Sequence, residues 1–199
     1  MTSIRNNDGE PTMADRLLIA ARESILLVGW KRTTLTDIAS RAGVSRMTVY
    51  RTYADMTELL ADLMMREQAA LVAAAVDSVD VSRDWPDRLA IGVARTVAAL
   101  RENDLFRRMI DVDPEWVLPY LLERRGRFQD AVLVIVGERI AEGQRAGGIR
   151  TGDPVVLART VLLAAHGFAL SAPIMTDAAV GQPVLDDELA ELLRRYLTP

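Results

Sequence analysis

Basic, hydroxyl and aromatic side chains gather between residues 31 and 53, and their chemistry suits the binding of nucleic acid. Arginine and lysine bind phosphate, whereas arginine, threonine and apolar methyl groups can contact base edges in the major groove. The segment has five basic residues and one acid, a formal charge of +4, while the other 176 residues carry −8. This pattern predicts a basic DNA-binding surface on an acidic body. Side chains suited to bases or phosphates follow closely here: Arg46, Met47, Thr48, Tyr50 and Arg51.

Two short helices are predicted to position these side chains. The first has an apolar stripe at three- and four-residue steps, formed by Leu35, Ile38, Ala39 and Ala42. Thr33 is its expected N-cap, and Gly43 is expected to end it in a left-handed conformation. Ser45 is the expected N-cap of the second helix, in which Val49 is the buried anchor. Two helices joined by a short glycine turn form a helix-turn-helix, whose second helix enters the major groove.

The rest of the chain predicts helices and no strand, so the expected fold class is all-α. Trp30 is interpreted as a side chain that covers the core of the three N-terminal helices, and not as a base-stacking residue. The other helices are expected at about 12–28, 56–79, 84–101, 104–111, from 113–115 onward, 127–145, 153–172, and from Asp186 and Asp187 to near the end. The predicted parts are a flexible tail (1–11), a three-helix DNA-binding domain (12–55) and a helical ligand-binding and dimerisation domain (56–199), with 56–79 as the linking helix.

Two segments of the C-terminal half are apolar around the whole helix. These are residues 131–136, within the helix at about 127–145, and residues 161–165 with 168–170, within the helix at about 153–172. A helix without a polar face is buried on all sides. Burial inside one chain would explain this, but we favour a homodimer in which both helices pair with their copies as a four-helix interface.

The residues needed for enzymatic or metal chemistry are mostly missing from the chain. It has no cysteine, which excludes disulfides and thiolate metal sites and fits a reducing cytoplasm. Its one histidine, His166, has no carboxylate within a helical turn, and Asp111, Asp113 and Glu115 are interpreted as helix caps. We therefore expect no catalysis, no metal and no cofactor. We also expect no membrane span, because the longest uncharged apolar segment, 160–174, is shorter than the about 20 residues required.

A small-molecule pocket is suggested only by composition. Aromatic and methionine side chains with a few polar tips suit a mostly apolar ligand, although they also suit an ordinary core. The candidates lie on the middle helices and on one later helix: Phe106, Met109, Trp116, Tyr120, Phe128 and His166.

The segment from Thr33 to Tyr53, TTLTDIASRAGVSRMTVYRTY, resembles the signature of the tetracycline-repressor (TetR) family of bacterial regulators. The resemblance is strong over about residues 13–65. It implies an all-helical homodimer that binds a palindromic operator and loses affinity for DNA when a small molecule occupies the body. By position, it implies base contacts from Arg46, Met47 and Thr48, phosphate contacts from Thr34, Tyr50 and Tyr53, and places Lys31 and Arg32 near the DNA backbone.

Three positions depart from the family pattern. Met56 stands where a lysine is usual, Met47 where glycine or proline is common, and Thr52 where histidine or tyrosine is common. These departures concern the operator sequence and the affinity more than the mode of binding. The sequence therefore predicts a repressor of this kind, and the alternative is a helical enzyme or ligand carrier in which the helix-turn-helix is only scaffold.

Overall fold

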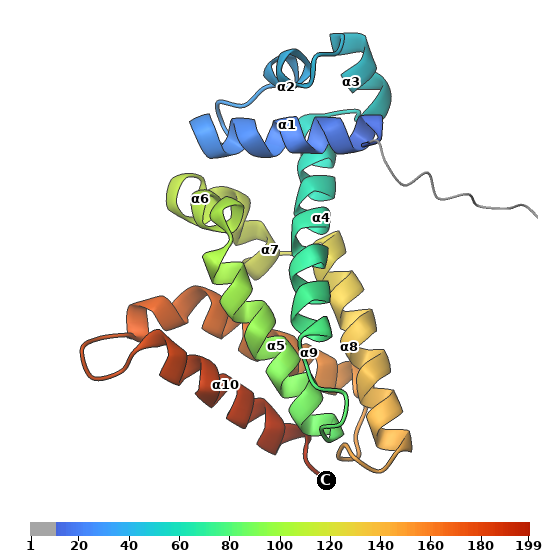
Figure 1. Cartoon of the computed structure of the whole chain (residues 1–199), viewed down its shortest axis with the longest axis vertical. Helices are drawn as coiled ribbons and strands as arrows, with labels where there is room; N and C mark the ends of the chain where they lie inside the picture. The colour runs from blue at the N-terminus through green and yellow to red at the C-terminus, as the bar shows by residue number, and fades with distance from the viewer. Residues whose placement is uncertain (1–10) are drawn as a thin grey trace, which may run out of the picture.

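The structure is a computed structural model that describes residues 11–199, and these residues form helices and no strand (Figure 1). The all-α prediction is confirmed, and the predicted flexibility of residues 1–11 falls almost wholly outside the described residues. The helices are α1 (Met13–Val28), α2 (Leu35–Ala42), α3 (Arg46–Thr52), α4 (Met56–Asp77), α5 (Trp85–Glu102), α6 (Asp104–Val112), α7 (Leu118–Leu122), α8 (Arg127–Arg145), α9 (Pro154–Ser171) and α10 (Gln182–Leu197).

Helices α1, α2 and α3 form a small head at one end of the molecule (Figure 1). The N-cap of α2 is Thr34, whose hydroxyl accepts the N–H of Asp37 while the Asp37 carboxylate accepts the N–H of Thr34. The prediction that Thr33 is this cap was therefore wrong by one residue. Thr33 is buried instead, and its hydroxyl donates to the carbonyl of Gly29 at 2.8 Å.

The turn between α2 and α3 has the predicted geometry. Gly43 lies in the left-handed region, with φ 67° and ψ 38°, and its N–H reaches carbonyls in the last turn of α2. The Ser45 hydroxyl then caps α3 by accepting the N–H of Thr48. Val49 is fully buried under the opposite face of α3. The short helix is thus held by its caps and one apolar anchor, and its other face is open to solvent.

Helix α4 connects the head to the larger body. Its first turns supply Leu59, Leu60 and Leu63 to the core of the head. Its 22 residues correspond to a length of about 33 Å, so the same rigid element continues deep into the body (Figure 1). Leu105 and Met109 of α6 also belong to the head core. The head therefore rests on two elements of the body.

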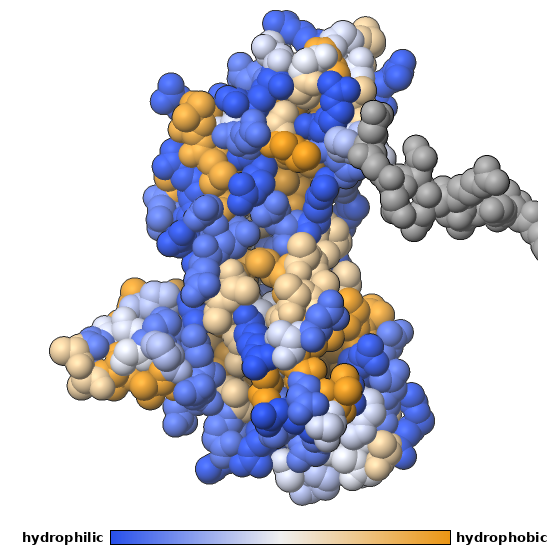
Figure 2. All heavy atoms as spheres, in the orientation of Figure 1, coloured by the Kyte–Doolittle hydropathy of each residue, from blue (hydrophilic) through white to orange (hydrophobic). Residues whose placement is uncertain are grey.

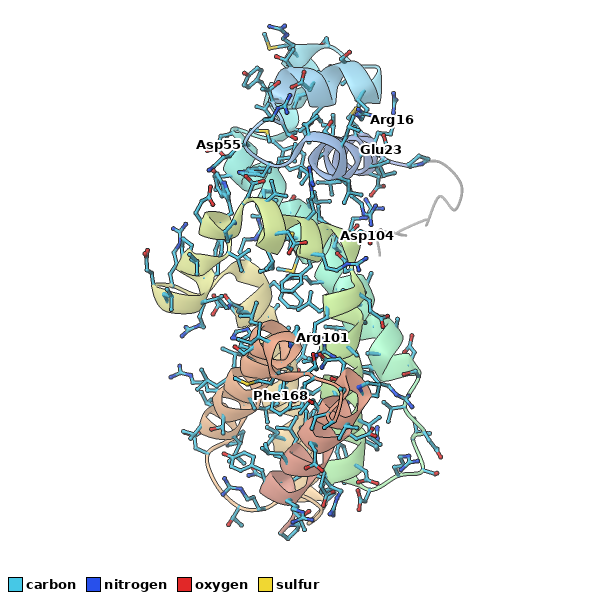
Figure 3. The ribbon with its side chains drawn as sticks, turned by 90° about the vertical axis from the view of Figure 1, so that its left-hand side faces the viewer. Arg16, Glu23, Asp55, Arg101, Asp104 and Phe168 are labelled. Carbon is cyan, nitrogen blue, oxygen red and sulfur yellow. The ribbon has the colours of Figure 1, made fainter. Side chains whose placement is uncertain are left out.

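The body is formed mainly by α5, α8, α9 and α10 around a second apolar core. Apolar side chains also reach its surface, as Figure 2 shows in orange over the lower part of the molecule. Arg101 of α5 ties the helices together: it donates to Asp186 of α10 at 2.6 Å and to the carbonyl of Phe168 in α9 at 3.3 Å. Arg101 and Phe168 lie close together in the middle of the body (Figure 3).

Two helix boundaries differ from the prediction because prolines begin helices here. The segment from 113–115 onward was expected to form one helix. It forms a 3₁₀ turn, Pro114–Trp116, and then the short α7, with Pro119 in its first turn. Helix α10 starts at Gln182 with Pro183 in its first turn, four residues before the expected start at Asp186. Proline lacks an N–H and is favoured where the first turn leaves N–H groups unbonded.

The segment Pro154–Met175, which comprises α9 and the 3₁₀ turn Ala172–Met175, is long and apolar enough to cross a membrane by length and composition. An 18-residue window of this segment has a mean hydropathy of 1.7, and 33% of that window is buried. The helix packs against α8, α5 and α10, with Leu157, Val161 and Ala165 buried in the body core. One side of α9 thus packs on the body core, while apolar side chains such as Val156 and Leu163 on the helix stay exposed.

The head and the body meet at a junction formed by residues 29–31 and 113–116. The carboxylate of Asp113, which is buried, accepts the N–H of Trp30 at 2.7 Å. The rings of Trp30 and Trp116 pack edge to face with centroids 5.0 Å apart. Asp113 and Glu115 are not side-chain caps as predicted, since Asp113 makes no capping hydrogen bond and Glu115 pairs with Lys31 of the head.

Replacement of Asp113 by alanine should destabilise this junction. The buried N–H of Trp30 would lose its acceptor, so the free energy of unfolding should fall by about 1–3 kcal/mol. Asp113→Asn is the matched control, because an amide oxygen can still accept this N–H, and it should lose less. Urea unfolding followed by circular dichroism, at one protein concentration, measures both. Equal losses for the two variants would contradict the assigned role of the acceptor.

Candidate DNA-binding surface and internal cavity

The outer face of α3 presents the side chains that the sequence singled out. Met47 is 71% exposed and Tyr50 is 56% exposed, and Arg46 and Arg51 are exposed beside them. Val49 lies on the buried face of the same helix. A seven-residue helix anchored on one side therefore offers guanidinium, thioether and phenol groups together to a partner, which suits both base edges and phosphates.

Internal ion pairs reduce the number of basic groups available in the head. Arg41 pairs with Glu23 at 3.3 Å and donates to Ser24 at 3.1 Å, and Lys31 pairs with Glu115. Among the described residues, the other basic side chains between residues 31 and 53 have no carboxylate within ion-pairing distance: Arg32, Arg46 and Arg51. The field directed at a partner therefore comes mainly from three guanidinium groups, of which two belong to α3.

Three predicted contact residues have roles within the head itself. The Thr34 hydroxyl caps α2, and the Thr48 hydroxyl lies 2.9 Å from that of Ser45. Both side chains remain accessible in part. Tyr53 is only 3% exposed and belongs to the head core. Burial first, and then the neighbouring Asp62 carboxylate, raise the pKa of Tyr53 to about 12. Tyr53 thus packs inside the head, and it is not part of the surface that α3 presents.

A cavity of about 840 Å³ runs through the body beside α4. Its walls come from α4, α5, α6, α7, α8 and α9 and are largely apolar. All six residues singled out from composition line it: Phe106, Met109, Trp116, Tyr120, Phe128 and His166. The volume lies within the range of about 300–1,000 Å³ that is typical of ligand sites.

Much of the cavity wall comes from apolar residues that the sequence did not single out for a pocket. Examples are Leu60 and Met64 of α4 and Val93 and Leu100 of α5. The same apolar spacing serves a packed core and a cavity wall, so no local signal distinguishes them. Trp85, where α5 begins, was also missed as a lining residue.

Several polar side chains in or near the cavity wall are engaged in contacts within the protein or lie outside the wall. Gln129 lines the cavity, but its amide accepts the N–H of Gly126 at 2.6 Å and donates to the carbonyl of Tyr120 at 2.8 Å. It therefore fastens α7 to α8. Arg107 pairs with Asp104 at 2.6 Å, and Arg108 is not part of the cavity wall.

His166 of α9 lines the cavity. Burial alone lowers the pKa of this histidine below its ordinary value of 6.5. The imidazole is therefore neutral at pH 7 and offers one donor and one acceptor to the cavity. Within residues 11–199, no group of three or more histidine, cysteine, aspartate or glutamate side chains could hold a metal ion.

This geometry defines a helix-turn-helix DNA-binding regulator with a cavity in its body. Residues 17–63 match the family model described as bacterial regulatory proteins, tetR family. A protein of Mycobacterium tuberculosis, named as an uncharacterized HTH-type transcriptional regulator, is 33% identical over 192 residues, which cover 96% of this chain and 97% of that protein. The chain belongs to the tetR family of bacterial transcriptional regulators, and it is a regulator and not an enzyme.

Solved structures of regulators share the fold over nearly the whole chain. The fatty acid degradation regulator FadR of Bacillus halodurans superimposes with a TM-score of 0.66 at 18% identity, covering 94% of this chain and 96% of that one. FadR of Bacillus subtilis, solved in complex with stearoyl-CoA, gives 0.65 at 17% identity, covering 91% and 97%. At these identities the likeness concerns the fold.

The lowered pKa of His166 predicts a specific pH dependence of stability. Because the folded state resists protonation of this imidazole, its contribution is complete above the ordinary pKa of about 6.5 and is lost as the pH falls below it. The chain has no other histidine, so His166→Gln should remove this loss between about pH 7.5 and pH 5. Urea unfolding across that range tests it. Parallel pH profiles for the two proteins would show that His166 is not responsible.

Proposed function

We propose that the protein is a repressor that binds a palindromic operator as a homodimer and is released by a small, largely apolar ligand in the body cavity. The observation that carries this proposal is the pairing of an exposed recognition helix with a cavity whose wall includes Trp116, the ring that packs against Trp30 of the head. The complex of Bacillus subtilis FadR with stearoyl-CoA supports a ligand with an apolar chain. Since a repressor acts on chromosomal DNA, we place it in the cytoplasm.

On the DNA side, α3 lies in the major groove of each half-site. Arg46, Met47 and Thr48, in its first turn, contact base edges, and the Met47 methyl suits a thymine methyl. The surrounding residues bind phosphates or lie near them: Tyr50, Arg51, Thr34, Lys31 and Arg32. Tyr53 has no part in this interface because its side chain is buried.

Ligand binding is coupled to the head through the body elements that support it. Helix α4 lines the cavity from Thr57 to Asp77 and also supplies core residues to the head. The two heads bind DNA when their spacing matches half-sites about 34–36 Å apart. A ligand that binds more tightly to a conformation with another head spacing will shift the protein to the state released from DNA. A carrier or enzyme, the alternative function, would not require the unpaired arginines of the head.

Helices α8 and α9 form the homodimer interface. Their exposed apolar side chains include Val134 (60% exposed), Val156 (56%) and Leu163 (71%). In the single chain these two helices pack against each other but leave this face uncovered. The same pair from a second copy would cover it and complete a four-helix interface.

Two substitutions in α3 separate base contacts from phosphate contacts. Arg46→Ala should weaken binding to the operator by about 1–3 kcal/mol and also relax the base preference. Tyr50→Phe should weaken binding to all sequences alike, by about 1 kcal/mol, because it loses only a hydroxyl donated to phosphate. Gel-shift titration with the promoter region beside the protein's own gene, against random DNA in moderate salt, measures both.

Failure of the wild-type protein to bind any fragment of that region better than random DNA would contradict a specific repressor. Equal effects of the two substitutions on every sequence would contradict the assigned roles while leaving DNA binding intact.

Light scattering coupled to size-exclusion chromatography should give twice the chain mass of 22.0 kDa. Leu163→Glu, on the exposed face of α9, should shift the protein toward monomers because it buries a charge in an apolar interface. Leu27→Glu is the matched control, since Leu27 is 67% exposed on α1 in the head. A wild-type mass of 22 kDa, or equal effects of both variants, would rule out this interface.

A further inference from the structure

Positively charged side chains outnumber negatively charged ones in the cavity wall. Its described lining includes five arginines and only one carboxylate, Asp77, although the whole chain has a net charge of −4. The arginines are Arg88, Arg124, Arg125, Arg127 and Arg139. The remaining wall is mostly apolar, so the cavity combines hydrophobic walls with guanidinium groups at particular places. Such a combination suits a ligand that is apolar over most of its length and anionic at one position.

The cavity is long relative to its width. Its lining follows α4 from Thr57 to Asp77, which corresponds to about 30 Å at 1.5 Å per residue. A volume of about 840 Å³ spread over such a length leaves a narrow slot. A single extended chain can occupy a slot of this shape, whereas a compact ligand of equal volume would leave its ends empty.

The arginines fall into two groups at opposite ends of this slot. Arg124 and Arg125 lie in the loop between α7 and α8, and Arg127 is the first residue of α8, all on the side of the head. Arg125 pairs with Asp130 at 2.7 Å and Arg127 pairs with Asp62 at 2.9 Å. Arg124 has no carboxylate partner among the described residues, and its guanidinium lies 5.4 Å from the ring centroid of Tyr120 in the cavity wall.

The far end of the slot is less suited to an anion. Arg88 lies there, over the ring of Trp85 at 4.9 Å. However, Asp77 lines the cavity at the same end, and Asp84 caps the helix one turn before Arg88. Arg139 already pairs with Glu142 at 2.9 Å. Like Arg124, Arg88 has no carboxylate within ion-pairing distance among the described residues, but the carboxylates of Asp77 and Asp84 lie near it and make this end less suited to an anion.

Arg124 also lines a second, smaller hollow next to the cavity. This hollow has a volume of about 360 Å³ and is shared with Trp116, Tyr120, Lys31 and Glu115. A negative group held by Arg124 would therefore lie beside Lys31 of the head and would compete with Glu115 for it. The hollow has room for a bulky anionic group that does not fit the narrow slot.

We propose that the ligand is an anionic amphiphile whose unbranched apolar chain lies in the slot and whose anionic end is held by Arg124, at the side facing the head. This inference rests on the proposed function, because it specifies the ligand of the same cavity. Arg124 is then the residue that selects acids over neutral lipids. A carboxylate and a thioester that carries phosphates share this chemistry. The carboxylate would lie beside Arg124 at the end of the slot, whereas the phosphates of the thioester would extend into the hollow.

The test measures binding of dodecanoate, dodecanoyl-CoA and 1-dodecanol below their micelle concentrations, by quenching of the tryptophans that line the cavity, Trp85 and Trp116. Wild-type protein should bind the better acid at least about 10-fold more tightly than the alcohol, as expected for a charge-assisted hydrogen bond. Arg124→Gln should remove most of this preference and leave alcohol binding unchanged. The matched control Arg88→Gln, at the other end of the slot, should keep it.

The outcomes separate the ligand class from the function. Equal affinity for acid and alcohol, or no binding of any of the three, would overturn the inference even when the protein binds its operator. Loss of the preference for acid over alcohol in Arg88→Gln but not in Arg124→Gln would overturn the proposed orientation of the ligand, in which its anionic end faces the head. Selective binding of an acid by a protein that shows no operator binding would support the inference and contradict the repressor. A preference for dodecanoyl-CoA over dodecanoate would assign the hollow to the phosphates.

Discussion

The contact between the buried carboxylate of Asp113 and the backbone N–H of Trp30 is the constraint on which the relation of head to body depends. A carboxylate is costly to bury unless it accepts hydrogen bonds, and an N–H inside the protein requires an acceptor. Each group therefore needs the other, and their 2.7 Å contact holds residues 83 positions apart. Gly29 permits the close approach, because its φ of 83° and the nearby Asp113 oxygen leave little room for a side chain.

The same junction lies directly against the cavity. Trp116 lines the cavity and packs edge to face on Trp30, and its neighbour Glu115 pairs with Lys31. Residues 113–116 thus have the cavity on one side and the head on the other. A ligand acts on an equilibrium only through contacts that differ between the two states. For the proposed ligand, the junction is a second connection to the head, in addition to the continuous helix α4, and it lies close in the chain to the DNA-binding surface.

Much of the fold was predictable because helices and their caps depend on residues close in the chain. The turn at Gly43, the cap at Ser45 and the burial of Val49 and Trp30 all follow from local spacing and were confirmed. The six residues singled out from composition all line the cavity, and their contact with a ligand stays a prediction. The burial of Tyr53 and the early start of α10 were not predicted. They depend on packing against α4 and on a proline that begins a helix.

The sequence by itself determined the all-α class, the helix-turn-helix and the residues that α3 turns outward, because helical periodicity and capping act over only a few residues. Only the tertiary structure decided which arginines are free to bind a ligand or DNA, and that Asp113 and Glu115 hold the head instead of capping helices. It also decided that apolar faces enclose a cavity instead of a filled core. These properties depend on residues brought together from distant parts of the chain, and no local pattern specifies them.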